Sequence, residues 1–61
     1  MPYVTVKALG GRTADQKRGL VRDITEAFVK NFGAKPEMVH IDIIEYTQEN
    51  LANAGKLFTD R

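Results

Sequence analysis

The sequence contains no cysteine and only one histidine among its 61 residues. Without cysteine, neither a disulfide framework nor a thiolate zinc site can stabilise the fold. One histidine is also too few for a histidine-rich metal centre. The sequence therefore predicts a domain that holds together without metal ions or covalent cross-links.

An excess of charge of one sign is also lacking, because nine basic and eight acidic residues give a net charge of +1. This balance provides no electrostatic footprint for nucleic acid or for an anionic membrane. No apolar run approaches the roughly 20 residues of a membrane span, and no signal peptide pattern is visible. We therefore expect a cytoplasmic protein that binds neither nucleic acid nor membrane.

The chain is short, and residues 1–61 make a single domain at the small end of what folds unaided. A domain of this size buries too little apolar surface to offset the entropy of ordering its chain by a wide margin. Because neither disulfides nor metal ions are available, association between copies is the remaining source of stability. We therefore expect a homo-oligomer.

A first strand is expected over Tyr3–Leu9, where apolar and polar residues alternate. The apolar face would hold Val4, Val6 and Ala8, and the mixed face Tyr3, Thr5 and Lys7. Gly10 and Gly11 end this strand, since two glycines permit a turn that residues with a Cβ would resist. One apolar face predicts a strand that is covered on one side only.

A helix is expected from Thr13 to Phe32. Thr13 and Gln16 have the spacing of a capping box, in which each side chain accepts a hydrogen bond from the other residue's backbone N–H. A stripe with helical periodicity follows, formed by Leu20, Val21, Ile24, Ala27, Phe28 and Phe32. Gly33 suits the left-handed position after the last turn, and Pro36 prevents continuation.

A second strand is expected over Val39–Tyr46. A strand, a helix and a second strand form a β-α-β unit with parallel strands and a right-handed crossover. The predicted fold class is therefore α/β with a single β-α-β unit. Its open sheet edges invite pairing with a second copy into a four-stranded sheet.

The tail, residues 47–61, allows two interpretations. The spacing of Leu51, Ala54 and Leu57 suits a short helix, whereas Asn53 and Gly55 favour turns. Propensity alone does not decide between them.

Pro2 is the residue best suited to a role in catalysis. A proline at the start of a strand removes no interior ladder bond, so a purely structural role is possible. Initiator methionine is, however, normally trimmed before a small residue such as proline. Removal of Met1 would leave Pro2 with a free secondary amine, and an α-amino group has a pKa of about 8 in water. Desolvation lowers that value toward the range in which a general base works at neutral pH.

These features together resemble the 4-oxalocrotonate tautomerase family, and the resemblance covers nearly the whole chain. Its members are chains of about sixty residues that start Met-Pro and form a β-α-β unit. The segments that carry the resemblance are PYVTVK at 2–7, GRT at 11–13, DQK at 15–17 and LANAGK at 51–56. The last of these is similar to the glycine-containing C-terminal hairpin of the family.

The resemblance implies roles for four residues. Pro2, once Met1 is removed, would be the catalytic general base, and Arg12 would bind or polarise a carboxylate or carbonyl oxygen of the substrate. Leu51 falls where the family usually has a phenylalanine that keeps the site dry, and His40 falls at the family's second active-site arginine. The resemblance also implies a hexamer built as a trimer of dimers, with sites that combine residues of different subunits.

Each of these residues has a structural alternative. Arg12 could be a solvated loop residue beside a helix cap. His40 could be an interface residue, because it would lie on the uncovered face of the sheet. Leu51 could serve subunit packing alone. For Pro2 we favour the functional interpretation, because the strand that it opens matches the family so closely.

The function predicted is that of a cofactor-independent tautomerase, acting on small enol or unsaturated 2-keto acids through Pro2 and Arg12. A related proline-dependent hydratase, dehalogenase or decarboxylase of small unsaturated acids is the alternative within enzymes. From another class, a ribbon-helix-helix DNA-binding dimer would also be small and start with a strand. It would require two helices after that strand and a basic strand face, whereas Lys7 is the only lysine or arginine in Tyr3–Leu9.

Overall fold

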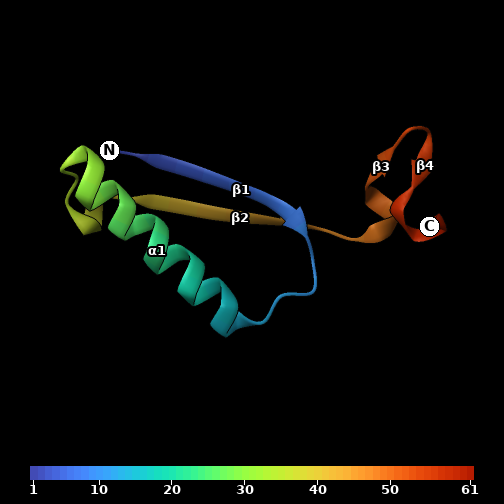
Figure 1. The fold of residues 1–61 in the computed structure, drawn as a ribbon, viewed down its shortest axis with the longest axis horizontal. Coiled ribbons are helices and arrows are strands. Elements are labelled where there is room, and N and C mark those ends of the chain that lie inside the picture. Colours follow the sequence, from blue (N-terminus) through green and yellow to red (C-terminus); the bar gives the residue numbers. More distant parts are fainter.

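Two parallel strands and one long helix form the main body of the protein (Figure 1). The computed structural model describes residues 1–61 without a gap. In chain order, the principal elements are β1 (Tyr3–Leu9), α1 (Ala14–Phe32), β2 (His40–Tyr46), β3 (Ala52–Asn53) and β4 (Lys56–Leu57). The predicted β-α-β unit with parallel strands is therefore confirmed, and the second strand starts one residue later than expected.

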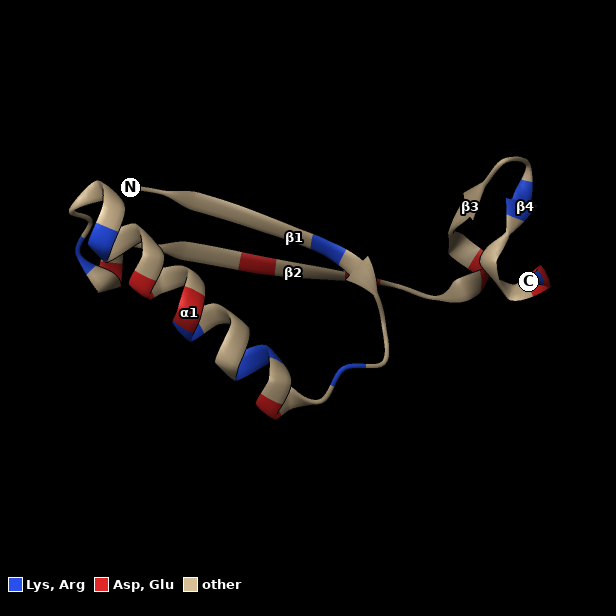
Figure 2. Cartoon of the chain, viewed as in Figure 1, with Lys and Arg blue, Asp and Glu red and all other residues tan.

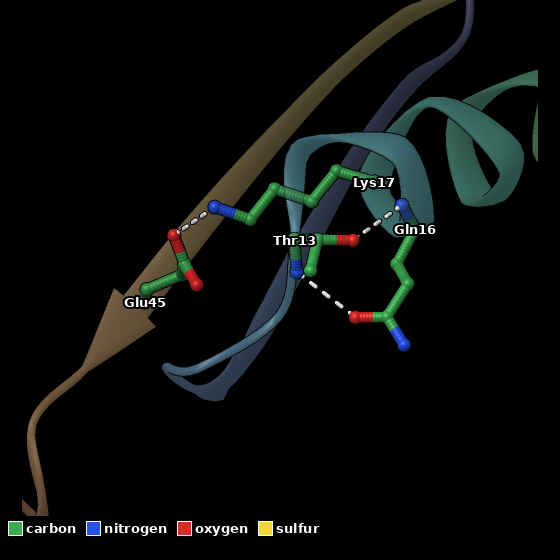
Figure 3. Close-up of polar contacts among 4 residues, drawn as sticks. All are labelled: Thr13, Gln16, Lys17 and Glu45. Carbon is green, nitrogen blue, oxygen red and sulfur yellow. Dashed lines mark hydrogen bonds and ion pairs between the residues drawn. The ribbon is translucent and has the colours of Figure 1, made fainter.

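Both ends of α1 are fixed by the residues that the sequence indicated. The Thr13 hydroxyl accepts a hydrogen bond from the Gln16 backbone N–H at 3.1 Å, and the Gln16 side chain accepts one from the Thr13 N–H at 2.9 Å (Figure 3). Gly33 has φ of 70°, and its N–H is directed to the carbonyls of Phe28 and Val29. A left-handed glycine satisfies carbonyl groups that the last turn would otherwise leave without partners.

We expect Thr13→Ala to lower the free energy of unfolding by about 1 kcal/mol, because it removes one half of the capping box. Chemical denaturation at fixed protein concentration measures this change. Thr47→Ala is the matched control, since Thr47 precedes a short 3-10 turn and its side chain makes no capping hydrogen bond. Equal losses for the two variants would contradict the role assigned to the cap.

The helix covers one face of the two-stranded sheet. Half-buried residues alternate with exposed ones over residues 3–7 and 40–44, as the sequence predicted. The pattern then shifts by one residue, so the predicted place of Ala8 on the covered face is wrong: Ala8 is exposed and Leu9 is half-buried. The half-buried apolar side chains of this layer are Val4, Val6, Val21, Ile24, Phe28, Ile41 and Ile43. An ion pair between Lys17 of α1 and Glu45 of β2 ties the helix to the sheet at one end (Figure 3).

No residue of the single chain is fully buried. The molecule is elongated, with principal extents of 43 × 23 × 14 Å. Two large apolar side chains lie mainly in solvent, Tyr3 with 72% and Phe32 with 75% of its surface exposed. A monomer with so little burial has weak hydrophobic stabilisation. The expected association between copies stays a prediction that this exposure supports.

The tail forms a hairpin, which confirms the hairpin implied by the family resemblance and excludes the alternative of a short helix through Leu51, Ala54 and Leu57. Strands β3 and β4 pair antiparallel, at the end of the molecule away from the amino terminus (Figure 1). The two residues between them, Ala54 and Gly55, both have positive φ, of 51° and 78°. Two positive φ angles in a two-residue connection are typical of a type I′ turn, whose twist suits a hairpin.

Charged residues of both signs are interspersed along α1, so no single-sign face forms there (Figure 2). A three-residue 3-10 turn and strand β2 follow α1, where a ribbon-helix-helix protein would have a second helix. The DNA-binding alternative is therefore incompatible with this fold. No helix of the protein has the length and apolarity required to cross a bilayer.

Candidate active site

Pro2 lies immediately before β1, beside the last turn of α1 (Figure 1). Its carbonyl oxygen accepts a hydrogen bond from the backbone N–H of His40 at 3.0 Å, which holds the first residues of the two strands in register. Pro2 is half-buried and lines a cavity of about 380 Å³. The cavity is lined by Met1, Pro2, Phe32 and Ala34.

This cavity provides an apolar setting for an amine. None of its four lining residues has an ionisable side chain. Met1 is 68% exposed, so it covers Pro2 only loosely. With Met1 in place the Pro2 nitrogen is an amide without basicity, and removal of Met1 would leave a secondary amine at the cavity. An apolar environment disfavours the charged form of such an amine.

Arg12 lies in the loop between β1 and α1. Gly11, which precedes it, has φ of 113°, a conformation that residues with a Cβ rarely adopt. Arg12 lines a hollow of about 240 Å³ together with Gln16, Lys17 and Leu20. The guanidinium of Arg12 makes no ion pair within the chain, whereas Lys17 is paired with Glu45. Its planar fork is therefore available to a carboxylate.

Pro2 and Arg12 do not meet within one chain. They lie at opposite ends of β1, whose seven residues span about 20 Å at about 3.3 Å per residue. The structure therefore places the two most important predicted site residues in separate halves, one at each end of the sheet.

His40 opens β2 next to Pro2, but its ring lies on the other side of the sheet. Because side chains alternate along a strand, His40 and Tyr3 share the face that α1 does not cover. Their rings are stacked, with centroids 5.1 Å apart and planes inclined by 19°. On the same face the Thr5 hydroxyl donates a hydrogen bond to Asp42 at 2.9 Å.

Leu51 lies at the same end of the sheet as Arg12. It is half-buried, and its carbonyl accepts a hydrogen bond from the Phe58 N–H at 2.9 Å, which anchors the hairpin. A cavity of about 490 Å³ between the strand ends and the tail is lined by Lys7, Ala8, Leu9, Tyr46, Leu51 and Phe58. In a single chain Leu51 is therefore remote from Pro2.

The largest hollow of the protein, of about 620 Å³, runs along a flank of α1 and includes none of the predicted site residues. Its lining is Arg18, Val21, Arg22, Thr25, Glu26, Val29, Lys30 and Pro36. It contains no group with the reactivity of a free proline amine. No three His, Cys, Asp or Glu side chains gather anywhere in the chain as potential metal ligands.

Sequence reasoning missed two side chains near the site. Phe32 belongs to the apolar stripe through its contact with Phe28, and it also lines the Pro2 cavity. Tyr3 lies on the mixed face of the strand, and the structure adds its stack with His40. The position of Phe32 at the last residue of α1 was the signal that could have indicated this second role.

Comparison with known proteins identifies the family of the chain. The family described as tautomerase enzyme matches residues 2–61. The 2-hydroxymuconate tautomerase of Bacillus subtilis (strain 168) is 48% identical over 60 residues, which cover 98% of this chain and 97% of that protein.

Two solved structures are also similar. YwhB, a homologue of 4-oxalocrotonate tautomerase, is 47% identical with a TM-score of 0.91 over 98% of each chain. A second homologue of that enzyme, TTHB242, is 34% identical with a TM-score of 0.94 over 100% of this chain and 97% of its own. The chain belongs to the tautomerase enzyme family, and it is a tautomerase-like isomerase with the 4-oxalocrotonate tautomerase fold.

Proposed function

We propose that the protein moves a proton in small enol or unsaturated 2-keto acids, with the amine of Pro2 as the general base after Met1 is removed. The observation that carries this proposal is the position of Pro2 at an apolar cavity that holds no other ionisable group. The similarity to a protein named 2-hydroxymuconate tautomerase supports the substrate class, since that name denotes an enol acid.

In this reaction the proline nitrogen takes a proton from one position of the conjugated acid and returns it to another. The electron pair left behind delocalises toward the carbonyl oxygen, where negative charge develops. Arg12 pairs with the carboxylate or with this oxygen through its guanidinium. The proton moves to and from the amine only, so neither an oxidant nor a second substrate is consumed.

Because Pro2 and Arg12 lie at opposite ends of β1, the reaction requires a second copy that brings its Arg12 end to the Pro2 end of the first. We assign this role to a homo-oligomer, a hexamer built as a trimer of dimers. The open edges of the two-stranded sheet and the absence of buried residues in one chain support association. In this assembly Leu51, at the Arg12 end, would help to exclude water from a neighbouring Pro2, and His40 would face the substrate of another copy.

A mixing experiment tests the shared site. Pro2→Ala and Arg12→Ala should each be nearly inactive on an enol acid. When the two variants are dissociated, mixed in equal amounts and reassembled, about a quarter of the sites should combine an intact Pro2 with an intact Arg12 from different copies. Activity should therefore return to that fraction of the wild-type rate.

Native mass measurement provides the control, and a hexamer is expected for the wild type and for both variants. No recovery of activity in mixed hexamers would mean that Pro2 and Arg12 from different copies do not form a common site. A folded monomer at micromolar concentration would contradict the assembly itself.

A further inference from the structure

Phe32 is an aromatic residue in an unusual place. It is the last residue of α1, and 75% of its surface is exposed although it belongs to the apolar stripe of the helix. Its ring lies edge-to-face against Phe28, with centroids 5.0 Å apart. Phe28 is half-buried between helix and sheet, so this contact orients the Phe32 ring from the inside of the fold.

One exposed aromatic residue alone carries little information, because folded proteins leave much apolar surface in solvent. The position of Phe32 is informative because it lines the cavity of Pro2 together with Met1 and Ala34. Removal of Met1 would leave Phe32 as the only large side chain of the cavity. Its ring would then be the main surface offered to a substrate at the proline amine.

We propose that Phe32 is a specificity-determining residue of the Pro2 site, whose ring excludes water from the amine and contacts the conjugated plane of the substrate. This inference rests on the proposed function of Pro2. It narrows that function to a substrate class, namely enol acids that carry an aromatic substituent, because two aromatic rings gain offset or edge-to-face contacts. A saturated chain of equal size gains only burial.

The Phe32 ring should also lower the pKa of the Pro2 amine. An apolar wall disfavours the protonated amine and so lowers its pKa, which leaves more free base at neutral pH. The cavity lining contributes no competing charge. Titratable side chains next to the lining residues along the chain or in the strand pairing are Tyr3 and His40, on the opposite face of the sheet, and Lys35, which follows Ala34.

The test compares Phe32→Leu, Phe32→Ala and Phe32→Glu, each with Met1 removed and Pro2 intact. A carboxylate beside the amine should raise its pKa by about one unit, so kcat/KM of Phe32→Glu should fall about tenfold near pH 6 and recover near pH 9. Phe32→Leu should leave the acidic limb of the kcat/KM–pH profile at its wild-type position. It should lose preference for an aromatic enol over an aliphatic one, and Phe32→Ala should show both effects in part.

Val29→Glu is the matched control, because Val29 is an exposed apolar residue of the same helix that does not line the Pro2 cavity. It should leave the acidic limb unmoved. NMR titration of isotope-labelled Pro2 gives the amine pKa without any substrate, and native mass verifies the assembly of each variant.

The outcomes separate the two proposals. If Pro2→Ala abolishes turnover but no Phe32 variant moves the amine pKa or the aromatic preference, the role of Phe32 is wrong and the function of Pro2 stands. If the wild type converts no enol acid, the proposed function fails whatever the Phe32 variants do to the amine. If Phe32→Glu does not assemble, the NMR titration and substrate preference of Phe32→Leu and Phe32→Ala decide alone.

Discussion

Pro2→Ala is expected to lower kcat for an enol acid by about two orders of magnitude or more, because a positioned general base contributes about 10²–10⁴. An amino-terminal alanine still offers an amine, but that primary amine lacks the ring that fixes the direction of the nitrogen lone pair. The loss should therefore appear mainly in kcat. Steady-state kinetics with Met1-free protein measures it.

The same replacement should leave fold and assembly nearly unchanged. Pro2 is only half-buried, and its contribution to the strand pairing is a backbone carbonyl that accepts from the His40 N–H. Alanine retains that carbonyl. Wild-type turnover by well-folded Pro2→Ala protein would rule out Pro2 as the base.

The unprocessed chain is a matched control for this result. With Met1 attached, the Pro2 nitrogen is an amide and cannot accept a proton at neutral pH. The two forms differ in one exposed residue, so their folds should be equivalent. Intact mass distinguishes them, and turnover should be proportional to the fraction of chains that lack Met1.

The β-α-β unit was predictable because its signals are local. The start of α1 is marked by Thr13 and Gln16, and its end by Gly33. Each cap forms hydrogen bonds with residues only a few positions away, so tertiary contacts were not needed to locate the ends of the helix. Alternation likewise identified both faces of β1 as far as Lys7, beyond which the observed pattern shifts by one residue. Each of these patterns involves residues that are close together in the sequence, so the sequence alone reveals it.

The tail was less predictable because nothing in the sequence indicates that Ala54 adopts a positive φ. A positive φ is uncommon for alanine, and only Gly55 beside it indicated a turn. Leu51 and Leu57, whose spacing suggested a helix, instead lie just before the hairpin and in its second strand. The hairpin was anticipated only through resemblance to the tautomerase family.

The residues of the candidate site could be proposed from the sequence, but their arrangement in space could not. Pro2 and Arg12 were identified by their chemistry and by family resemblance, yet a single chain holds them at opposite ends of β1. The rings of Tyr3 and Phe32 are mainly exposed although both are aromatic. Whether such a residue serves the interior, an interface or the site cannot be decided from helical or strand periodicity alone.

His40→Arg is expected to raise kcat/KM on an enol acid with two carboxylates by about 10- to 100-fold. A charge-assisted hydrogen bond is worth roughly 1.5–3 kcal/mol, and about 1.4 kcal/mol corresponds to one decade in rate. Arginine always carries its charge and can pair with a carboxylate through two parallel hydrogen bonds. A neutral imidazole does neither.

The fold should tolerate this change. The His40 ring is exposed on the uncovered face of the sheet, and its side-chain contact is the stack with Tyr3 at 5.1 Å. A guanidinium group also stacks on aromatic rings, so the partner of Tyr3 is replaced rather than lost. His40→Gln is the matched control, because it keeps hydrogen-bonding capacity but cannot become charged.

A comparison of enol acids with one and with two carboxylates distinguishes the possible roles of His40. For an enol acid with one carboxylate, such as an aryl-pyruvate, Arg12 satisfies the only charge, so His40→Arg should change its rate by less than about twofold. Wild-type protein should accordingly prefer the monocarboxylate. His40→Gln should keep this preference, because its amide carries no charge. Equal rates on both substrate types, unmoved by His40→Arg, would assign His40 to a subunit interface and leave Arg12 as the only cation that meets the substrate.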